Sequence, residues 1–265
     1  MLTSFLALLF FGCLTGVTTV LFGFGGGFIT VPVVYGVLTA TARPGADAMH
    51  VAVATSAAVM VVNAVAAALA QWREGRLRRA YVWPLTGYIA IGAVAGSFSA
   101  TLIGGTALRL LFAAYLLVTI ADSLLRKGFL AMPDRTRPEP LTRATVTLGG
   151  TGIGFVAAAL GVGGSVMTVP LLRRRGLPMV EATAMANPLS VPVAVSGTLV
   201  YALAPTGTGQ LGYLDLTAAA ALLLGSLPTI AVTRRITGRV PDRVHSVAYL
   251  VLLLVVLVAM LVMGA

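Results

Sequence analysis

Seven stretches of the chain contain no charged residue, and they limit what it can fold into: residues 1–42, 48–72, 80–108, 144–172, 182–214, 216–233 and 244–265. A helix needs about 20 apolar residues to cross the hydrocarbon of a bilayer. Only 10% of the residues are charged, against about 25% in a soluble domain. The stretches are continuously apolar and lack the alternation of a barrel strand. The sequence therefore predicts an all-α polytopic membrane protein with about eight apolar segments.

A glycine-rich motif occurs twice. FGFGGGFITVPVV at residues 22–34 aligns without a gap with LGVGGSVMTVPLL at residues 160–172, at an offset of 138. Six of the thirteen positions are identical, and four of these six are glycine or proline. The chain is therefore interpreted as a tandem duplication. Its predicted halves are residues 1–130 and 144–265, joined by a polar, proline-containing linker at 131–143.

Basic residues indicate how the two halves are oriented. They crowd the loop at 73–79 in the first half, but the matching loop at 203–213 of the second half has none. If each glycine segment enters and leaves on one side, the second half is inverted. All basic residues except Arg43 and Arg109 then share one face, which the positive-inside rule makes cytoplasmic, with both termini on the other side. Inverted repeats with broken helices are typical of secondary transporters.

The glycine segments are predicted to break their helices. Only Ser165–Leu172 separates Gly164 from Arg173, about 12 Å of helix, which is too short to cross about 30 Å of hydrocarbon. A re-entrant segment is expected here. In the first half, Phe28–Ala42 is longer, and a full crossing stays an alternative.

Consecutive glycines at a helix break allow close approach of a ligand, and a half-helix N-terminus favours an anion. Close helix packing through small residues is the alternative explanation for one such cluster, and its repetition favours the ligand site. Polar residues in the next apolar segment of each half are further candidates. The predicted substrate-binding residues are Gly25, Gly26, Gly27, Thr30, Thr55, Ser56, Asn63, Gly163, Gly164, Ser165, Thr168, Asn187 and Ser190, with helix breaks at Pro32, Pro170 and Pro188.

Other residue types give little sign of chemistry. The single cysteine, Cys13, excludes a disulfide framework and a multi-cysteine metal site, and no cofactor or metal is predicted. Asp122 and Asp215 are expected near helix ends, and His50 is a candidate for coupling to a proton. The formal charge of +10 is explained by loop residues that set the topology, so nucleic acid is not a predicted partner, and the oligomeric state is left open.

The two glycine motifs, together with AVATS at 52–56, resemble those of the sulfite exporter TauE/SafE family. The resemblance covers both halves. It implies a bacterial or plant permease for small sulfur-containing anions such as sulfite, thiosulfate or organosulfonates, often an exporter. For this chain it points to the bacterial inner membrane. Gly25, Gly26, Gly163 and Gly164 fall on the family's repeated motifs. Ser165 stands where the first repeat has a third glycine, which makes the two predicted sites unequal.

Three functions were weighed. The first is a secondary transporter with the anion held between the two glycine loops. The second is an anion channel, which the repeat also permits. The third is an intramembrane serine hydrolase with Ser165 as nucleophile and His245 as base, although no oxyanion residues are evident. The transporter is the favoured prediction.

Overall fold

The computed structural model describes residues 2–40, 47–125, 138–205, 211–235 and 240–262, and within these ranges all regular structure is helical. The first half contains α1 (Leu2–Phe22), α2 (Gly27–Ala40), α3 (Ala48–Arg73), α4 (Arg79–Thr101) and α5 (Gly105–Leu125). The second half contains a π-helical turn η1 (Thr145–Gly149), α6 (Gly150–Ala159), α7 (Ser165–Arg174), α8 (Met179–Leu203), α9 (Leu216–Thr233) and α10 (Asp242–Val262).

Seven of the described helices are long and apolar enough to cross a membrane: α1, α3, α4, α5, α8, α9 and α10. Two shorter apolar segments, Gly27–Ala40 and Thr145–Ala159, accompany them. Large apolar side chains such as Phe10, Leu117 and Leu148 are exposed on the outside of the bundle, as expected for a surface that faces lipid. The prediction of an all-α multi-pass membrane protein is confirmed.

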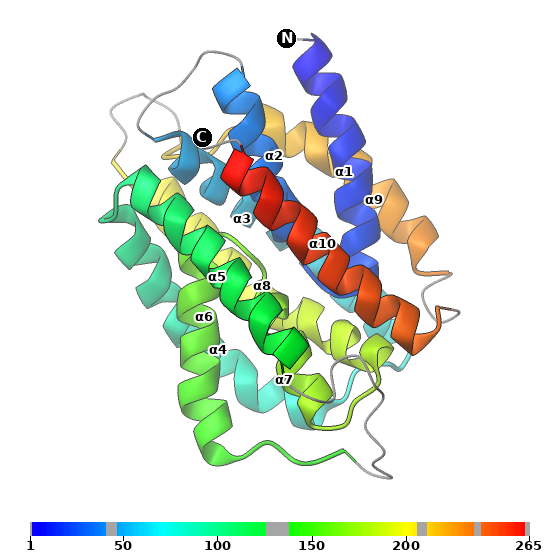
Figure 1. Cartoon of the computed structure of the whole chain (residues 1–265). Helices are drawn as coiled ribbons and strands as arrows, with labels where there is room; N and C mark the ends of the chain where they lie inside the picture. Colours follow the sequence, from blue (N-terminus) through cyan, green and yellow to red (C-terminus); the bar gives the residue numbers. More distant parts are fainter. Residues whose placement is uncertain (1, 41–46, 126–137, 206–210, 236–239, 263–265) are drawn as a thin grey trace.

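Two helical hairpins replace single crossings at the glycine motifs. In the first, the chain turns at Gly23–Gly26, and α2 runs back beside α1 towards the N-terminal end of the bundle (Figure 1). In the second, it turns between α6 and α7. With 14 and 10 residues, α2 and α7 are about 21 and 15 Å long, too short to cross the hydrocarbon. The short return helix predicted for the second motif is therefore present in both halves.

The two halves have opposite orientations. The last helices of the halves, α5 and α10, are in contact and run in opposite directions (Figure 1). Similarly, α1 starts at the N-terminal end of the bundle, whereas η1 and α6 start at the other end (Figure 1). The structure is therefore a pair of inverted-topology repeats. Most of the predicted linker at 131–143 lies outside the described residues, which resume at Pro138.

Each hairpin packs mainly on the other half. Helix α1 lies against α9, and its counterpart α6 lies against α4. Glycines make both contacts close: a Cβ on Gly16 would collide with the Ser226 carbonyl, and one on Gly154 with the Ile89 carbonyl. Gly16 and Gly154 are equivalent at the offset of 138. Small residues at such seams let helix backbones approach and gain dispersion contacts that lipid cannot replace.

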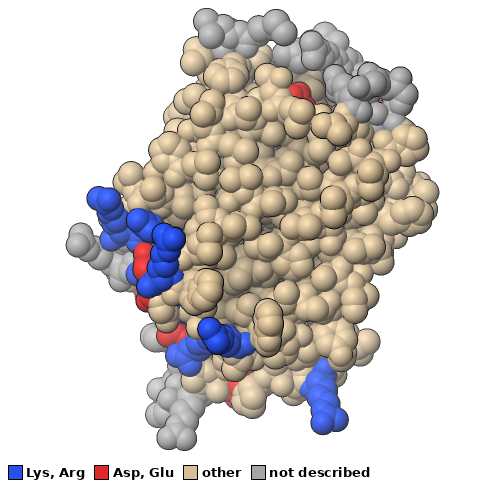
Figure 2. Space-filling view, turned by 180° about the vertical axis from the view of Figure 1, so that it is seen from behind, with Lys and Arg blue, Asp and Glu red and all other residues tan. Residues whose placement is uncertain are grey.

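Ion pairs gather at the end of the bundle opposite the N-terminus. Arg78 pairs with Glu181 at 2.7 Å, and Arg173 with Asp242 at 2.8 Å. Arg174 also pairs with the carboxylate of Asp122. Figure 2 shows Lys and Arg in the lower half of one face, reaching mid-height at its left edge, with a broad band of uncharged surface above them. This end, called the basic end below, is where the sequence predicted the cytoplasmic face; Arg43 and the linker residues before 138 lie outside the described residues.

Candidate functional site

The glycine turns of the two hairpins touch each other inside the bundle. A Cβ on Gly27 would lie 2.8 Å from the carbonyl oxygen of Gly161, and one on Gly163 would lie 2.6 Å from that of Phe24. Ser56 of α3 lies between the turns, with its Oγ 2.9 Å from the Gly27 oxygen and 2.7 Å from the Gly161 oxygen. Side chains at Gly27 and Gly163 would push the turns apart, so the meeting of the two backbones requires glycine at both positions, although Gly27 corresponds to Ser165 and Gly163 to Gly25 in the repeat.

Replacing Ser56 by alanine should loosen this junction. The change removes the one hydroxyl proton that the two buried carbonyl oxygens share, at a cost of about 1 to 3 kcal/mol. Thermal unfolding of the purified protein in detergent would measure the loss. Ser99→Ala is the matched control, because the Ser99 hydroxyl bonds only within its own helix, to the Ala95 oxygen. Equal melting temperatures for the two variants would contradict a structural role of the bridge.

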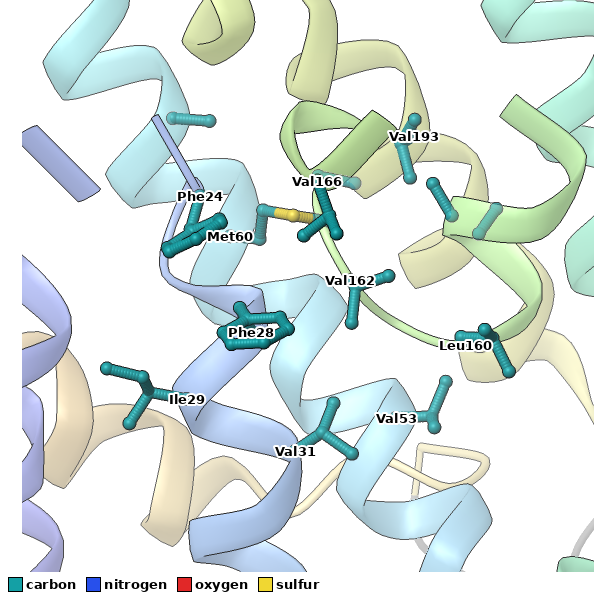
Figure 3. Close-up of a cluster of buried hydrophobic side chains, with 14 of the residues drawn as sticks. Phe24, Phe28, Ile29, Val31, Val53, Met60, Leu160, Val162, Val166 and Val193 are labelled. Atoms are coloured by element: carbon teal, nitrogen blue, oxygen red, sulfur yellow. The ribbon is translucent and has the colours of Figure 1, made fainter. Parts of the chain in front are cut away.

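Apolar side chains surround the junction. The rings of Phe24 and Phe28 stack at 4.7 Å, and Met60, Val162 and Val166 close around them from α3 and the second hairpin (Figure 3). These five side chains are fully buried. In such surroundings a hydrogen bond to a ligand is stronger than in water, and a polar group left without a partner is costly.

One side of the junction carries a cluster of polar groups, here called the polar cradle: Thr15 and Thr19 of α1, Gly26, and Asn63 of α3. A Cβ on Gly26 would lie 2.7 Å from the Asn63 Nδ2 and 2.9 Å from the Thr15 methyl group. All three side chains are completely buried. Ser226 of α9 donates to the Asn63 Oδ1 at 2.8 Å, which fixes the amide so that its Nδ2 faces Gly26.

The equivalent place in the second half is apolar. Gly164 corresponds to Gly26, and its Cβ would meet Ile153 at 3.3 Å and Val193 at 3.9 Å. Ile153 is the repeat counterpart of Thr15 at the offset of 138, and Val193 takes the position of Asn63. The backbone of the hairpins is thus repeated, but the polar side chains that face Gly26 have apolar counterparts at Gly164.

Several polar atoms at the junction have no hydrogen-bond partner among the described residues. They are the Asn63 Nδ2, the Thr15 Oγ1, the Asn187 Oδ1 and the Thr168 Oγ1. Each such group costs about 1 to 3 kcal/mol when it stays unsatisfied, and buried groups of this kind are rare without a reason. In the first turn of α2, Gly27 and Thr30 already donate to the Phe24 and Gly26 oxygens, and the N–H groups of Phe28 and Ile29 add two more donors. The Asn63 amide, the threonine hydroxyls and these N–H groups can hold a small anion without a basic side chain, whereas the Asn187 Oδ1 can only accept.

The structure brings most of the predicted residues to the junction, where their side chains have different hydrogen-bond partners. Thr30 donates to the Gly26 oxygen at 2.8 Å, and Asn187 donates to the Thr19 oxygen at 3.2 Å. Ser190 bonds within α8, and a Cβ on Gly163 would lie 2.8 Å from its Oγ. Thr55 lies elsewhere: its hydroxyl accepts from the Asp215 N–H, before α9. Thr55 was predicted to bind substrate beside the glycine turns, but its hydroxyl faces the start of α9 instead.

The prolines do not break their helices. The helices α2, α7 and α8 run through Pro32, Pro170 and Pro188, and the chain breaks at the glycines instead. A proline removes the hydrogen bond to the carbonyl four residues before it. For Pro170 this carbonyl belongs to Val166, and the Tyr249 hydroxyl of α10 donates to it at 3.3 Å. A partner from another helix thus takes over the lost bond.

Thr15, Thr19 and Ser226 were missed from the sequence. The threonines stand in α1 before the glycine motif, whereas the candidates were sought within and after it. The signal for Ser226 was present, because Gly225–Ser226 repeats Gly96–Ser97 at an offset of 129. Its contact with Asn63 depends on α9 crossing α3, which the sequence does not specify.

The remaining polar candidates serve the scaffold. Asp215 caps α9 by accepting from the Ala218 N–H at 2.9 Å, as its place before a helix predicted. His50 is buried, and its Nε2 lies 2.9 Å from the Ile103 oxygen while its ring stacks on Tyr213. It therefore anchors the turn between α4 and α5. Among the described residues no group of three or more His, Cys, Asp or Glu side chains could hold a metal ion.

Spanning helices in two inverted repeats, with paired hairpins at the centre, form the architecture of a membrane transporter. The chain belongs to the sulfite exporter TauE/SafE family, whose sequence profile matches residues 8–260. It is 27% identical over 226 residues to a probable membrane transporter protein of Haemophilus influenzae, covering 82% of this chain and 83% of the relative.

Two further relatives carry the same description. A probable membrane transporter protein of Xylella fastidiosa is 30% identical over 165 residues, covering 61% of this chain and 59% of the relative. One from Methanocaldococcus jannaschii is 25% identical over 207 residues, covering 75% and 73%. No solved structure matches the chain.

Proposed function

We propose that this protein is a secondary transporter that moves a small sulfur-containing anion, of the sulfite, thiosulfate or organosulfonate class, by alternating access. One observation carries the proposal: two inverted glycine hairpins meet inside a membrane-spanning bundle, beside buried polar groups that have no partner in the part of the chain that the structure describes. The family supports a transporter, and its description names sulfite.

Neutral donors suit an anion that must be released again. The polar cradle offers the Asn63 amide and the Thr15 hydroxyl, since the Thr19 hydroxyl donates to the Thr15 oxygen at 2.7 Å. The N-terminus of α2 adds backbone N–H groups and the positive end of its dipole. Charged partners would hold the anion more tightly and slow its departure. The donor set therefore fits a carrier that binds a desolvated oxyanion weakly.

We propose that the hairpins are the parts that move during alternating access. Their turns are in contact, so an anion can lie between them only when they separate. Because each hairpin packs on the other half through glycines, we expect α1 and α2 to move with α9, and α6 and α7 with α4. Alternating access between the repeats then exchanges which hairpin shields the anion.

A hydrolase built on Ser165 is less well supported. The Ser165 Oγ lies 3.5 Å from the Gly163 oxygen, and the Nε2 of His245 contacts the Leu21 oxygen. The proposed nucleophile and base thus have different partners. This arrangement favours transport over catalysis.

We place the protein in the inner membrane of a bacterium. In the proposed orientation the basic end faces the cytoplasm, and both termini lie on the opposite side of the membrane. Basic loops on the cytoplasmic side follow the positive-inside rule. Their field raises the local concentration of anions at that face. Loading from the cytoplasm would make the protein an exporter.

Transport in proteoliposomes tests the proposal. Purified protein should move radiolabelled sulfite or thiosulfate with saturation, and sulfate serves as a comparison anion. A pH gradient imposed in either direction would show whether a proton is coupled to the anion. Unsaturable electrical current would instead indicate a channel, and no movement of any sulfur oxyanion would refute the proposed substrate class.

A further inference from the structure

A pocket of about 430 Å³ lies between α5, α6 and α7, away from the polar cradle. Its lining includes Thr119, Asp122, Gly152, Ile153, Val166 and Arg174. One end of the pocket is polar, where Arg174 meets Asp122. The other end reaches the second glycine turn, because Val166 is in the first turn of α7 and Ile153 lies 3.3 Å from the Cβ position of Gly164. The pocket thus extends from the basic end of the bundle towards the second glycine turn.

The ion pair at the polar end can be exchanged for a ligand. Arg174 is the only basic residue among the described residues that line the pocket. Its side chain is 33% exposed and that of Asp122 is 29% exposed, so water screens the pair and makes it weak. A guanidinium binds two oxygens of an oxyanion in the same forked geometry with which it binds a carboxylate. An incoming oxyanion can therefore take the place of the Asp122 carboxylate.

The repeat supplies this cation on one side only. Pro170 corresponds to Pro32 at the offset of 138, and at the same offset Arg174 corresponds to Gly36. The first hairpin thus has no cation at the equivalent position. The two arginines that flank Arg174 also pair with carboxylates: Arg173 with Asp242, and Arg175 with Glu139. Arg109 of α5 reaches α2 at the opposite end of the bundle, but it donates there to the Tyr35 hydroxyl at 3.4 Å and, among the described residues, has no carboxylate exchange like that of Arg174 and Asp122.

We propose that Arg174 is a docking site for small oxyanions at the mouth of an access pocket, and that Asp122 is the carboxylate that the anion displaces. The transported anion would meet Arg174 first and reach the glycine turns afterwards. This inference rests on the proposed function for the assumption that the bound anion is also transported. The protein would then have two anion sites: the uncharged polar cradle, and a charged site at Arg174 that the anion meets first on its way from the basic end.

Transport kinetics give the first test. In proteoliposomes with radiolabelled sulfite, Arg174→Gln is expected to raise the KM for loading from the basic end about tenfold, while Asp122→Asn lowers it several-fold. The matched control is Arg78→Gln, which breaks an ion pair at the same end that does not line the pocket. Equal KM changes in Arg174→Gln and Arg78→Gln would mean general attraction by the basic end and would overturn the docking site.

Thiol labelling gives a second test that needs no transport. In a Cys13→Ser background, Gly152→Cys puts a thiol in the pocket, where a Cβ has open space. A thiosulfonate reagent carrying a sulfonate should label it faster than a reagent carrying an ammonium group. Arg174→Gln should reverse this preference, and sulfate should slow the labelling. An unchanged ratio of the two rates in Arg174→Gln would overturn the proposal, whereas the expected ratio with no transport would leave the pocket standing and refute only the transporter.

Discussion

Replacing Gly92 by leucine is expected to remove most of the folded protein. Gly92 of α4 lies against α6, where a Cβ would collide with the carbonyl oxygen of Thr151. A leucine there must separate two helix backbones along the whole seam, and the expected loss of stability is about 3 kcal/mol or more. Size-exclusion chromatography and thermal unfolding in detergent measure the folded fraction.

The control for this change lies on the same helix. Gly87 has open space around its Cβ position, so Gly87→Leu should leave the folded fraction and the melting temperature nearly unchanged. If Gly87→Leu and Gly92→Leu are equally stable, the close approach of α4 and α6 does not hold the fold together.

The second large effect is expected on transport. Asn63→Leu keeps the size of the side chain but removes the amide that faces Gly26 and leaves the Ser226 hydroxyl without its acceptor. A lost hydrogen bond to an anion is worth about 1.5 to 3 kcal/mol, or about 10- to 150-fold in kcat/KM. The variant should fold, because the Ser226 hydroxyl loses the Asn63 oxygen but keeps the Leu223 oxygen of its own helix as an acceptor at 3.4 Å, and radiolabelled anion uptake would report the loss.

Val193→Leu provides the matched control, because Val193 occupies the position of Asn63 in the other half and already lies in an apolar setting. The added methylene affects packing and stability but removes no hydrogen-bonding group, so transport per folded molecule should stay within about two- to threefold of the original protein. Similar transport losses in the two variants would show that packing at the hairpins, not the amide of Asn63, limits the rate.

Much of the fold could be predicted from the sequence because a bilayer leaves few choices. Long uncharged stretches dictate helices, and the distribution of arginines in the loops indicates the inversion of the second half. The spacing between Gly164 and Arg173 was sufficient to predict the short α7. The lengths of the uncharged segments thus predict which helices cross the membrane and which turn back.

The candidate site was harder to predict. The glycine motifs mark where the chain turns, but the side chains that face each turn come from helices far away in the sequence. Ser226 reaches Asn63 only because α9 crosses α3. The prolines were misleading as helix breaks, because a donor from another helix, such as Tyr249, can replace a missing backbone bond. Tertiary contacts decide both points.

The glycine seams also restrict how such a molecule could have arisen. A single repeat cannot cover its own hairpin, because α1 finds its glycine-matched surface on α9, and α6 finds it on α4. Before the duplication, two identical chains inserted in opposite directions would have had to exchange hairpins to make the same contacts. The present chain would then be an interlocked antiparallel dimer fused into one polypeptide, and its halves, produced as separate chains, should be stable only together.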